Sequence, residues 1–358
     1  MRLFFSAGEA SGDAYVAALA ARLAEDGVVM QGIVGAKGES AGVQAVASNR
    51  DWGAIGIYES LKVAPRIRRG YYSALSALAQ GTPGVCVPVD FGYMNIRLAR
   101  QAKAMGWKVL YFSPPGSWRR DKQGADLPQV ADEIVTPFPW SAEILRRMGA
   151  SVHWFGHPLK QMVAESGSPE GPRSGIAVLP GSRLHEVENN VPVVAKALEG
   201  FAGRIRLSCA PNVSAPELLA LWGRHSPLVA TAEPDLYPLL KSAEAAIVCS
   251  GTATLESALC GCPTVVVYRG GKAMELEYRI RRPKFDFISL PNILLGRMLL
   301  PELIQWDASP AAIREAVTAL LPDGLARRDQ LAGFDELGSL LGPADALDQT
   351  ARLIREMA

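Results

Sequence analysis

The sequence predicts an α/β protein made of two similar halves, each a doubly wound parallel sheet between helices. Short apolar runs alternate with longer segments of helical periodicity along most of the chain. At 358 residues, the chain is too long for one comfortable hydrophobic core. A run of turn formers at 166–173 separates the halves. We therefore expect two facing Rossmann-like domains, 1–165 and 174–330, with an interdomain cleft.

The predicted elements follow in order along the chain. In the first half we expect strands at 3–6, 31–34, 85–89, 108–112 and 133–136, and helices at 13–25, 59–79, 94–105 and 141–148. In the second half we expect strands at 175–179, 205–209, 228–230, 245–249 and 264–268, with helices at 186–201, 215–222, 234–242 and 252–259. Ligands of such sheets bind beyond the carboxyl ends of the strands, so the residues after each strand are the functional candidates.

The composition is that of an ordinary globular protein. The chain is 49% hydrophobic and 20% charged, with a formal net charge of +1, which argues against disorder and offers no basic excess for a nucleic-acid partner. The N-terminus turns polar by Ser6, unlike a signal peptide, and no apolar run approaches the ~20 residues that span a bilayer. We therefore expect a cytoplasmic protein that could still touch a membrane surface.

The five cysteines indicate reduced thiols rather than disulfides. Their number is odd and their spacing forms no framework, which favours a reducing compartment. Cys260 and Cys262 flank one glycine and could in principle bind a metal, but no second Cys or His pair has suitable spacing. We interpret them as small core residues around a turn and expect neither a metal nor a cofactor.

The strongest local pattern is an apolar strand that ends at Ser250-Gly251-Thr252, where a helix begins at once. Glycine lets the backbone approach a ligand, and the N–H groups and dipole of a helix N-terminus favour phosphate. Glu256 lies on the same helical face as Thr252 and could accept both hydroxyls of a ribose whose phosphates lie at the helix tip. A well-capped helix with a solvated glutamate explains the pattern equally well.

A second strand exit, Pro180-Gly181-Ser182-Arg183, combines a tight turn with a hydroxyl, N–H groups and a guanidinium. Arginine suits a diphosphate because its planar fork binds two oxygens together. The alternative is a surface arginine in a turn. Two phosphate-suited loops in one domain support each other, so we interpret both as parts of one nucleotide site.

Two strand exits in the first half carry acidic residues. Asp90 follows a strand directly and precedes a helical segment that contains Asn95. A carboxylate here could act as general base for a hydroxyl nucleophile, although from spacing alone a helix N-cap is the simpler interpretation. The opening loop, residues 8–13, matches neither the dinucleotide fingerprint nor the P-loop. Ser11 or Asp13 in it could cap the following helix.

Taken together, these motifs resemble the lipid-A-disaccharide synthase family. The matching pieces occur in the family's order from residue 4 to about 305: residues 6–13, Asp90 with Asn95, 113–114, 156–158, 179–183 with Glu186, 250–252 with Glu256, 289–296 and 301–305. No single piece is specific, but the combination is.

The resemblance implies a GT-B fold, whose last helices cross back to the first domain, here as a tail at 331–358. It also implies inverting transfer of an acylated glucosamine from UDP to an acylated glucosamine-1-phosphate, as in lipid A disaccharide formation, without a metal. Asp90 would be the catalytic base. The donor UDP would be held by Ser182, Arg183, Ser250, Gly251, Thr252, Glu256, Asn292 and Gln305, and the acceptor side would include Gly8, Glu9, Ser11, Asp13, Asn95 and Trp118.

The departures from the family lie mostly on the acceptor side. Tyr93 stands where the family has a second aspartate, and Trp118 is the one tryptophan kept from a Trp-Ala-Trp-Arg string. The acceptor could therefore be a related lipid. Segment 55–72 mixes Ile, Leu, Val and Tyr with basic residues, which suits a helix at the inner-membrane surface or a lid over acyl chains. An ordinary helix with a solvated basic face is the alternative, and Pro65 interrupts its periodicity.

Two other functions fit the same motifs. A UDP-sugar epimerase or hydrolase would keep the UDP loops without an acceptor base, and a catalytically silent sugar-nucleotide-binding protein would keep only the binding. His157 and His185 are interpreted as a turn residue and a surface residue rather than as catalysts. A C-terminal helix at 344–357 places Leu347, Ala351 and Ile354 on one side, where it packs on the first domain or mediates a homodimer.

Overall fold

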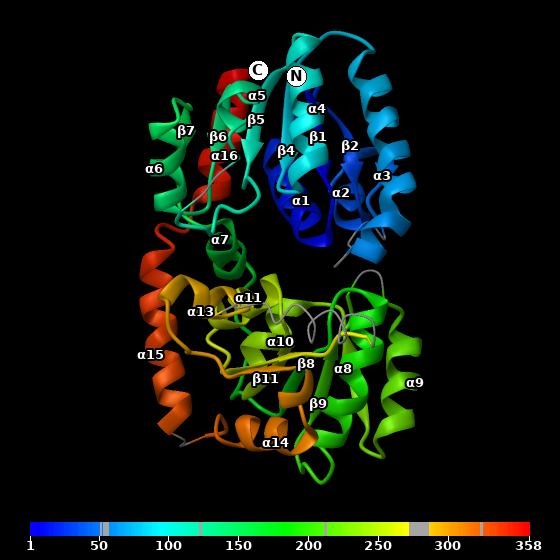
Figure 1. Cartoon of the computed structure of the whole chain (residues 1–358), viewed down its shortest axis with the longest axis vertical. Helices are drawn as coiled ribbons and strands as arrows, with labels where there is room; N and C mark the ends of the chain where they lie inside the picture. Colours follow the sequence, from blue (N-terminus) through cyan, green and yellow to red (C-terminus); the bar gives the residue numbers. More distant parts are fainter. Residues whose placement is uncertain (51, 53–56, 122–123, 211–212, 272–285, 323–324) are drawn as a thin grey trace. The chain divides into compact units, whose positions relative to one another are not determined.

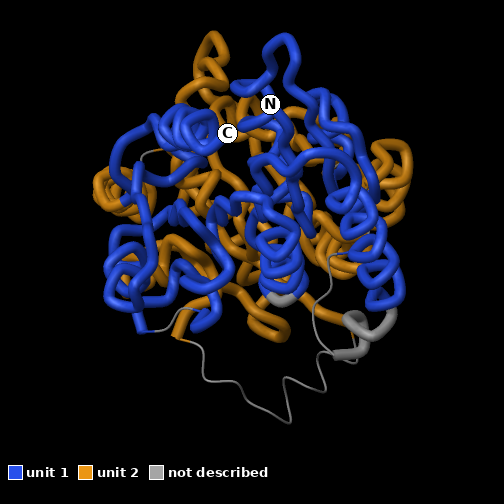
Figure 2. Tube along the Cα trace, turned by 90° about the horizontal axis from the view of Figure 1, so that it is seen from above, with its two compact units in different colours: residues 1–162, 341–358 blue, residues 163–340 orange. Residues whose placement is uncertain are grey.

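The structure is a computed structural model that describes residues 1–358 except 51, 53–56, 122–123, 211–212, 272–285 and 323–324. The chain divides into two compact units (Figure 2): residues 1–162 with 341–358 form unit 1, and residues 163–340 form unit 2. The boundary falls inside helix α7 (Pro158–Glu165). Helix α15 (Leu325–Leu340) belongs to unit 2, so the segment that returns to unit 1 is shorter than the tail expected from 331.

Unit 1 contains a seven-stranded parallel sheet in the order β3-β2-β1-β4-β5-β6-β7 (Figure 1). Its strands are β1 (Arg2–Ala7), β2 (Val29–Val34), β3 (Gln44–Ser48), β4 (Val85–Val89), β5 (Lys108–Phe112), β6 (Glu133–Val135) and β7 (Val152–His153). The sequence did not predict β3 and β7. Both are edge strands; β3 has exposed polar ends and β7 has two residues, so neither forms the apolar run that marks a buried strand.

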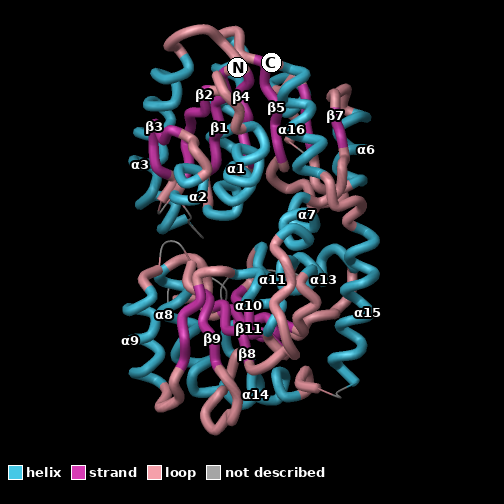
Figure 3. Tube along the Cα trace, turned by 180° about the vertical axis from the view of Figure 1, so that it is seen from behind, coloured by secondary structure: helices cyan, strands magenta, loops and turns pink. Residues whose placement is uncertain are grey.

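The helices of unit 1 alternate with these strands (Figure 3). They are α1 (Ala10–Leu23), α2 (Ala36–Ser40), α3 (Ile57–Leu78), α4 (Gly92–Ala104), α5 (Leu127–Val130), α6 (Pro139–Arg147), the first part of α7, and α16 (Ala346–Met357). Helix α3 continues through Pro65, which interrupts the sequence pattern but costs the helix only local backbone hydrogen bonding. On α16, Leu347, Ala351 and Ile354 are fully or almost fully buried, and α16 packs on α1.

Unit 2 repeats the architecture with a six-stranded parallel sheet in the order β10-β9-β8-β11-β12-β13. Its strands are β8 (Ile176–Leu179), β9 (Ile205–Ser208), β10 (Ala230–Glu233), β11 (Ala245–Cys249), β12 (Thr264–Tyr268) and β13 (Glu302–Ile304). Its helices are α8 (Leu184–Ala197), α9 (Ala215–His225), α10 (Leu236–Ser242), α11 (Thr252–Leu259), α13 (Leu290–Leu295), α14 (Pro310–Thr318) and α15, with a 3₁₀ turn η1 (Gln305–Asp307). Strand β10 begins later than predicted because Ser226 Oγ accepts the Leu228 N–H in a turn.

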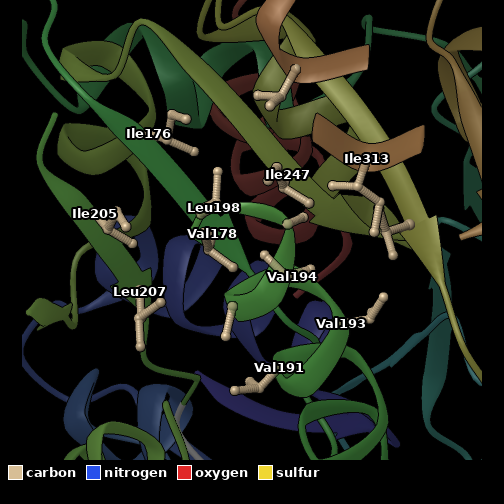
Figure 4. Packing of buried hydrophobic residues seen from close by; sticks show 14 of the residues in the cluster. Ile176, Val178, Val191, Val193, Val194, Leu198, Ile205, Leu207, Ile247 and Ile313 are labelled. Atoms are coloured by element: carbon tan, nitrogen blue, oxygen red, sulfur yellow. The ribbon is translucent and has the colours of Figure 1, made fainter. Parts of the chain in front are cut away.

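The core of unit 2 shows why its strands are continuous apolar runs. Ile176 and Val178 face one side of the sheet, where they pack in a cluster with Val191 and Val194 of α8 (Figure 4). Their neighbours Ala177 and Leu179 join a second cluster with Leu239 and Leu240 of α10. Since side chains alternate along a strand, helices cover both faces of this sheet.

Each sheet has one point where the strand order reverses. In unit 1 it lies between β1 and β4, with Ala7 paired to Val89. In unit 2 it lies between β8 and β11, with Leu179 paired to Val248. Loops that leave neighbouring strands in opposite directions open a crevice at their carboxyl ends, which is where doubly wound sheets bind ligands.

Candidate functional site

The strand exits of unit 2 bring together most of the residues predicted to bind UDP. Ser182 and Arg183 follow β8, whereas Ser250, Gly251 and Thr252 follow the adjacent β11. Gly181 has φ +127°, and a Cβ there would lie 2.5 Å from the Cβ of Glu186, so only glycine fits. Gly251, with φ +152°, is exposed with open space around it, which leaves its backbone accessible to a ligand.

Glu186 organises the loop after β8. Its side chain is almost fully buried, and its Oε2 accepts the N–H groups of Ser182 (3.0 Å) and Arg183 (3.2 Å). Its Oε1 accepts the Arg183 guanidinium at 2.8 Å. The sequence interpretation described this loop, with its N–H groups and its arginine, as suited to phosphate. In this structure the two N–H groups donate to the protein's own carboxylate, and the same carboxylate orients the Arg183 guanidinium.

Helix α11 carries the second part of the site. Its first turn starts at Thr252, after Gly251, and Ser250 Oγ donates to the Ile288 carbonyl at 3.1 Å. Glu256, one turn later, accepts the Tyr237 hydroxyl at 3.0 Å. A helix N-terminus attracts anions, and a carboxylate fixed by a tyrosine is suited to accept sugar hydroxyls. Tyr237 was not predicted; its position on α10 reveals its role only once the fold is known.

Asn292, predicted to bind UDP, lies inside unit 2. It is fully buried; its Nδ2 donates to the Leu300 carbonyl and to Glu302, both at 2.8 Å, and its Oδ1 accepts the N–H groups of Leu299 and Leu300. These bonds use the donors and acceptors of the amide. Asn292 therefore fixes the conformation of the loop at 299–300.

Glu302 is a second polar residue of this region that sequence reasoning missed. Its carboxylate accepts the N–H groups of Ile288 and Ser289 and the Ser289 hydroxyl, all within 2.9 Å. It therefore fixes the start of α13 beside the Ser250 loop. Gln305, just after β13, has φ +53°, and its Oε1 accepts the Gly270 N–H at 3.3 Å. Such a backbone is rare for a non-glycine residue and occurs often at functional sites.

Asn190 joins three strand exits of unit 2. It lies on α8 and is almost fully buried; its Nδ2 donates to the Pro180 carbonyl (3.0 Å) and to Cys249 Sγ (3.4 Å), and its Oδ1 accepts the Arg269 N–H (2.9 Å). The ends of β8, β11 and β12 are therefore held by one amide. A polar residue within the apolar stripe of Val187, Val191 and Val194 was the sequence signal for it, because a buried amide needs partners.

In unit 1, Asp90 occupies an unusual backbone conformation at the end of β4. Asp90 and Phe91 have φ +48° and +51°. The Asp90 carbonyl accepts the Tyr111 hydroxyl at 2.9 Å and Asn95 Nδ2 at 3.0 Å, and the Asp90 N–H donates to the Phe112 carbonyl. The residue is thus not the N-cap of α4, which is Phe91. A strained conformation held by surrounding groups favours a functional role over a capping one.

The environment of the Asp90 carboxyl group favours its protonated form. Burial, together with the nearby charge of Glu9, raises its pKa to about 6, against a smaller opposing effect of the Phe91 N–H. A carboxylate in this range is close to the best proton affinity for base catalysis near neutral pH. Glu9 precedes α1 in the loop after β1, next to the exit of β4.

Asn95 and Asp13, predicted on the acceptor side, both make hydrogen bonds to nearby backbone groups. Asn95 is fully buried: its Nδ2 also donates to the carbonyls of Ser6 and Val89, and its Oδ1 accepts Ser6 Oγ at 2.6 Å. Asp13 is also buried and accepts N–H groups of residues 35, 37 and 38, at the start of α2. Asn95 therefore holds the backbone at Asp90, whereas Asp13 ties α1 to the start of α2.

The remaining predicted residues of unit 1 lie at the same sheet edge. Gly8 is buried against the ring of Phe91. A Cβ at this position would lie 1.9 Å from that ring, so a larger residue does not fit. Ser11 is half-buried in the first turn of α1. Trp118, 40% exposed, lies in the loop after β5, with the Arg119 guanidinium 5.6 Å from its ring centre. The side chain of Tyr93 lies outside what the structure describes.

The histidines and cysteines form no reactive cluster. Burial lowers the pKa of His157 to about 3, and its Nδ1 accepts the Leu159 N–H at 3.2 Å in the turn before α7. His185 is half-buried in the first turn of α8. The five cysteines are unpaired, and four are buried. Among the residues that the structure describes, no group of three or more His, Cys, Asp or Glu side chains is arranged to hold a metal ion.

A pocket of about 520 Å³ opens beside Asp90 within unit 1. Its floor is aromatic: Trp52 packs 6.0 Å from Phe91, measured between ring centres, and against Gly70 of α3. Helices α3 and α4 form its walls, and Glu9, Arg68 and Arg97 line it together with apolar groups. None of the helices in the described part of the chain is both long and apolar enough to cross a bilayer.

The comparisons with known proteins agree with this geometry. The sequence profile of the lipid-A-disaccharide synthetase family matches residues 3–344. The lipid-A-disaccharide synthase of Myxococcus xanthus is 29% identical, over 99% of this chain and 97% of that protein. The enzyme of the same name from Syntrophus aciditrophicus is 32% identical, over 96% and 94%.

Solved structures share the fold at low identity. The calicheamicin glycosyltransferase CalG4 superposes with a TM-score of 0.61 at 16% identity, covering 100% of this chain and 99% of that one. The UDP-GlcNAc 2-epimerase of Neisseria meningitidis, bound to UDP-GlcNAc, gives 0.64 at 10% identity, with 99% and 100% covered. The fold alone therefore does not separate transferases from epimerases.

Two parallel sheets with ligand-suited loops at both switch points, together with these likenesses, define a glycosyltransferase of the GT-B class, as the sequence predicted. The chain belongs to the lipid-A-disaccharide synthetase family. It is a glycosyltransferase of lipid A biosynthesis.

Proposed function

We propose that this chain transfers an acylated glucosamine from UDP to an acylated glucosamine-1-phosphate, with Asp90 as the base. The observation that carries the proposal is the state of Asp90: a strained, firmly held residue at the switch point of unit 1, with a pKa raised to about 6. Neither a structural cap nor a simple nucleotide-binding protein needs such a carboxylate.

The donor binds in unit 2 on this proposal. Arg183, oriented by Glu186, and the N-terminus of α11 bind the diphosphate, and Glu256, fixed by Tyr237, accepts hydroxyls of the ribose. Ser182, Ser250, Gly251, Thr252 and Gln305 surround these groups, whereas Asn292 supports the loop from inside. The UDP named in the Neisseria meningitidis epimerase structure as part of UDP-GlcNAc is consistent with this assignment.

The proposed chemical step moves one proton to Asp90 and leaves one negative charge on the departing UDP. An acceptor hydroxyl oxygen forms a bond to the anomeric carbon of the donor, and Asp90 takes the proton of that hydroxyl. The bond from the anomeric carbon to the UDP oxygen breaks, and UDP leaves with the electron pair. Arg183 and the α11 N-terminus stabilise the negative charge that develops on the leaving diphosphate. A single displacement of this kind inverts the anomeric configuration.

The acceptor is an amphiphile, so the reaction takes place at a membrane surface on this proposal. The exposed side of α3 carries Arg66, Arg68 and Arg69, with Tyr72 56% exposed beside them. Basic and aromatic groups on one helix favour binding to an anionic bilayer. Vesicles with anionic lipids should sediment the protein, whereas neutral vesicles, or a variant with Arg66→Gln and Arg69→Gln, should sediment much less of it.

Mass spectrometry of the products tests the transferase assignment. The protein is incubated with UDP-2,3-diacylglucosamine and 2,3-diacylglucosamine-1-phosphate, and separately with UDP-N-acetylglucosamine alone. We expect a disaccharide phosphate and free UDP in the first reaction and no turnover in the second. Epimerised or hydrolysed sugar nucleotide without any acceptor would instead identify an epimerase or hydrolase, and UDP binding without turnover in either reaction would identify a silent binding protein.

A further inference from the structure

The pocket beside Asp90 is a groove between two helices of unit 1. Along α3, Val63, Ile67 and Tyr71 form an inner row at intervals of four residues, and these side chains are half-buried. A second row, Ala64, Arg68 and Tyr72, runs parallel to it along the exposed rim. The inner row and the floor are apolar, so the groove accepts hydrocarbon rather than a fully hydrated ligand.

The opposite wall of the groove belongs to α4 and begins at Phe91, next to Asp90. Phe91, Met94 and Arg97 follow one another at intervals of three residues, so they lie along one face of the helix. The helical rise places Arg97 about 9 Å along the axis from Phe91. The wall therefore runs from the residue beside Asp90 to a guanidinium, over a length comparable to one sugar ring with a substituent.

Charge is distributed unevenly along the groove. Arg68 and Arg97 are both exposed at its rim, while Glu9 lines it near the corner that holds Asp90. Two guanidinium groups facing one groove from different helices suit a doubly charged oxyanion, because each offers a planar fork of N–H donors. The carboxylates of Glu9 and Asp90 disfavour an anion beside them. A bound ligand is thus oriented with its anionic end away from Asp90.

We infer that this groove holds the acceptor and that Arg68 and Arg97 bind its phosphomonoester. The inference rests on the proposed function, which requires an acylated sugar phosphate near Asp90. The acyl groups lie on the apolar wall and the aromatic floor, the anomeric phosphate reaches the two guanidinium groups, and the reacting hydroxyl on the other side of the ring faces Asp90. Arg68 and Arg97 are then binding residues that select a phosphorylated sugar.

The test compares two acceptors with four proteins. Transfer is measured in detergent micelles, which removes the contribution of a charged bilayer, using 2,3-diacylglucosamine-1-phosphate and the same lipid without its phosphate. The proteins are the wild type, Arg97→Gln, Arg68→Gln and the control Arg100→Gln. Arg100 lies one turn after Arg97 on α4, is also exposed and pairs with Asp126 at 3.5 Å, but it does not line the groove.

For the phosphorylated acceptor, we expect Arg97→Gln and Arg68→Gln each to raise the acceptor KM about tenfold or more, with the donor KM and the affinity for UDP unchanged. For the acceptor without phosphate, wild type and variants should be equally poor. Arg100→Gln should resemble the wild type with both acceptors. Loss of discrimination between the acceptors in the arginine variants is the specific result, since a folding defect would lower both activities alike.

Two outcomes overturn the inference in distinguishable ways. If the wild type transfers sugar to the phosphorylated acceptor and the two arginine variants keep its KM, the phosphate binds elsewhere, and the proposed function stands without this assignment. If the wild type transfers to neither acceptor, the proposed function itself fails. Binding of the phosphorylated lipid is then measured by calorimetry, and equal affinity of wild type and Arg97→Gln rejects the anion site as well.

Discussion

The two units share one architecture, but the carboxylates that hold loops in both units differ from Asp90 at the switch point of unit 1. In unit 2, Glu186 and Glu302 each accept several N–H or hydroxyl donors of nearby loops. In unit 1, Asp13 does the same for α2, but Asp90 lies at the switch point in a buried environment that raises its pKa. The first group fixes loops, and Asp90 can exchange a proton.

A second parallel concerns the buried asparagines. Asn95 on α4 joins the ends of β1 and β4, and Asn190 on α8 joins the ends of β8, β11 and β12. Each amide holds the backbone of loops that carry predicted site residues. The comparison teaches that the fold provides a rigid switch point twice, and that the residues on the loops decide which chemistry each unit performs.

Replacing Asp90 is the strongest test of whether it differs in function from the carboxylates that hold loops. Asp90→Asn keeps the shape of the side chain but cannot take a proton, so we expect kcat to fall by about 10²- to 10⁴-fold. The affinity for UDP, measured by calorimetry, should not change, because Asp90 belongs to unit 1. A variant that keeps transfer activity would remove Asp90 from the reaction.

Replacing Arg183 should give the reverse signature. In Arg183→Ala the diphosphate loses its oriented guanidinium, and we expect kcat/KM for the donor to fall by about 10²- to 10³-fold, the range for loss of one charge-stabilising donor. In contrast to Asp90→Asn, the affinity for UDP should also fall. Arg183→Lys, which keeps the charge but loses the planar fork, should recover only part of the loss. Unchanged UDP affinity in Arg183→Ala would place the nucleotide elsewhere.

The sequence predicted the strands at the centres of both sheets and the loops that follow them. The runs at 85–89, 245–249 and 264–268 match β4, β11 and β12 without error, because buried parallel strands are continuous apolar runs. Short edge strands and the bounds of helices were less well predicted. The site loops were found from local pattern, since glycines and polar residues directly after an apolar run mark a strand exit.

The sequence could not show which polar side chains already have hydrogen-bond partners within the protein. Asn292 and Asp13 carry the residue types of a binding site, yet both are consumed by backbone groups from other elements. Conversely, Tyr111 is a core aromatic by pattern, but its hydroxyl holds the Asp90 carbonyl. These roles depend on contacts between residues far apart in the chain, which periodicity and spacing do not encode.

The pH dependence sharpens the contrast between Asp90 and the structural carboxylates. Because Asp90 must be ionised to accept a proton and its pKa is raised to about 6, kcat/KM should be flat above neutral pH and about tenfold lower at pH 5. Stability should change in the other direction: the native state binds this proton more tightly than the unfolded chain, so the contribution of Asp90 to stability increases as the pH falls through 6. Glu9→Gln should lower the midpoint of the activity profile, since the Glu9 charge raises the pKa of Asp90.

The smallest predicted effect tests whether Asn190 positions the donor loops or merely stabilises unit 2. Asn190→Leu keeps the volume of the side chain but leaves the Pro180 carbonyl and the Arg269 N–H without this partner. We expect donor binding to weaken by about 1 kcal/mol, which raises the donor KM about fivefold. Gln330→Leu is the matched control: Gln330 is equally buried and binds both backbone groups of Thr264, at the start of β12 rather than beyond its end. We expect both variants to lower the melting temperature, but only Asn190→Leu to raise the donor KM. Equal donor KM values in the two variants would show that Asn190 only stabilises unit 2 and does not position the donor loops.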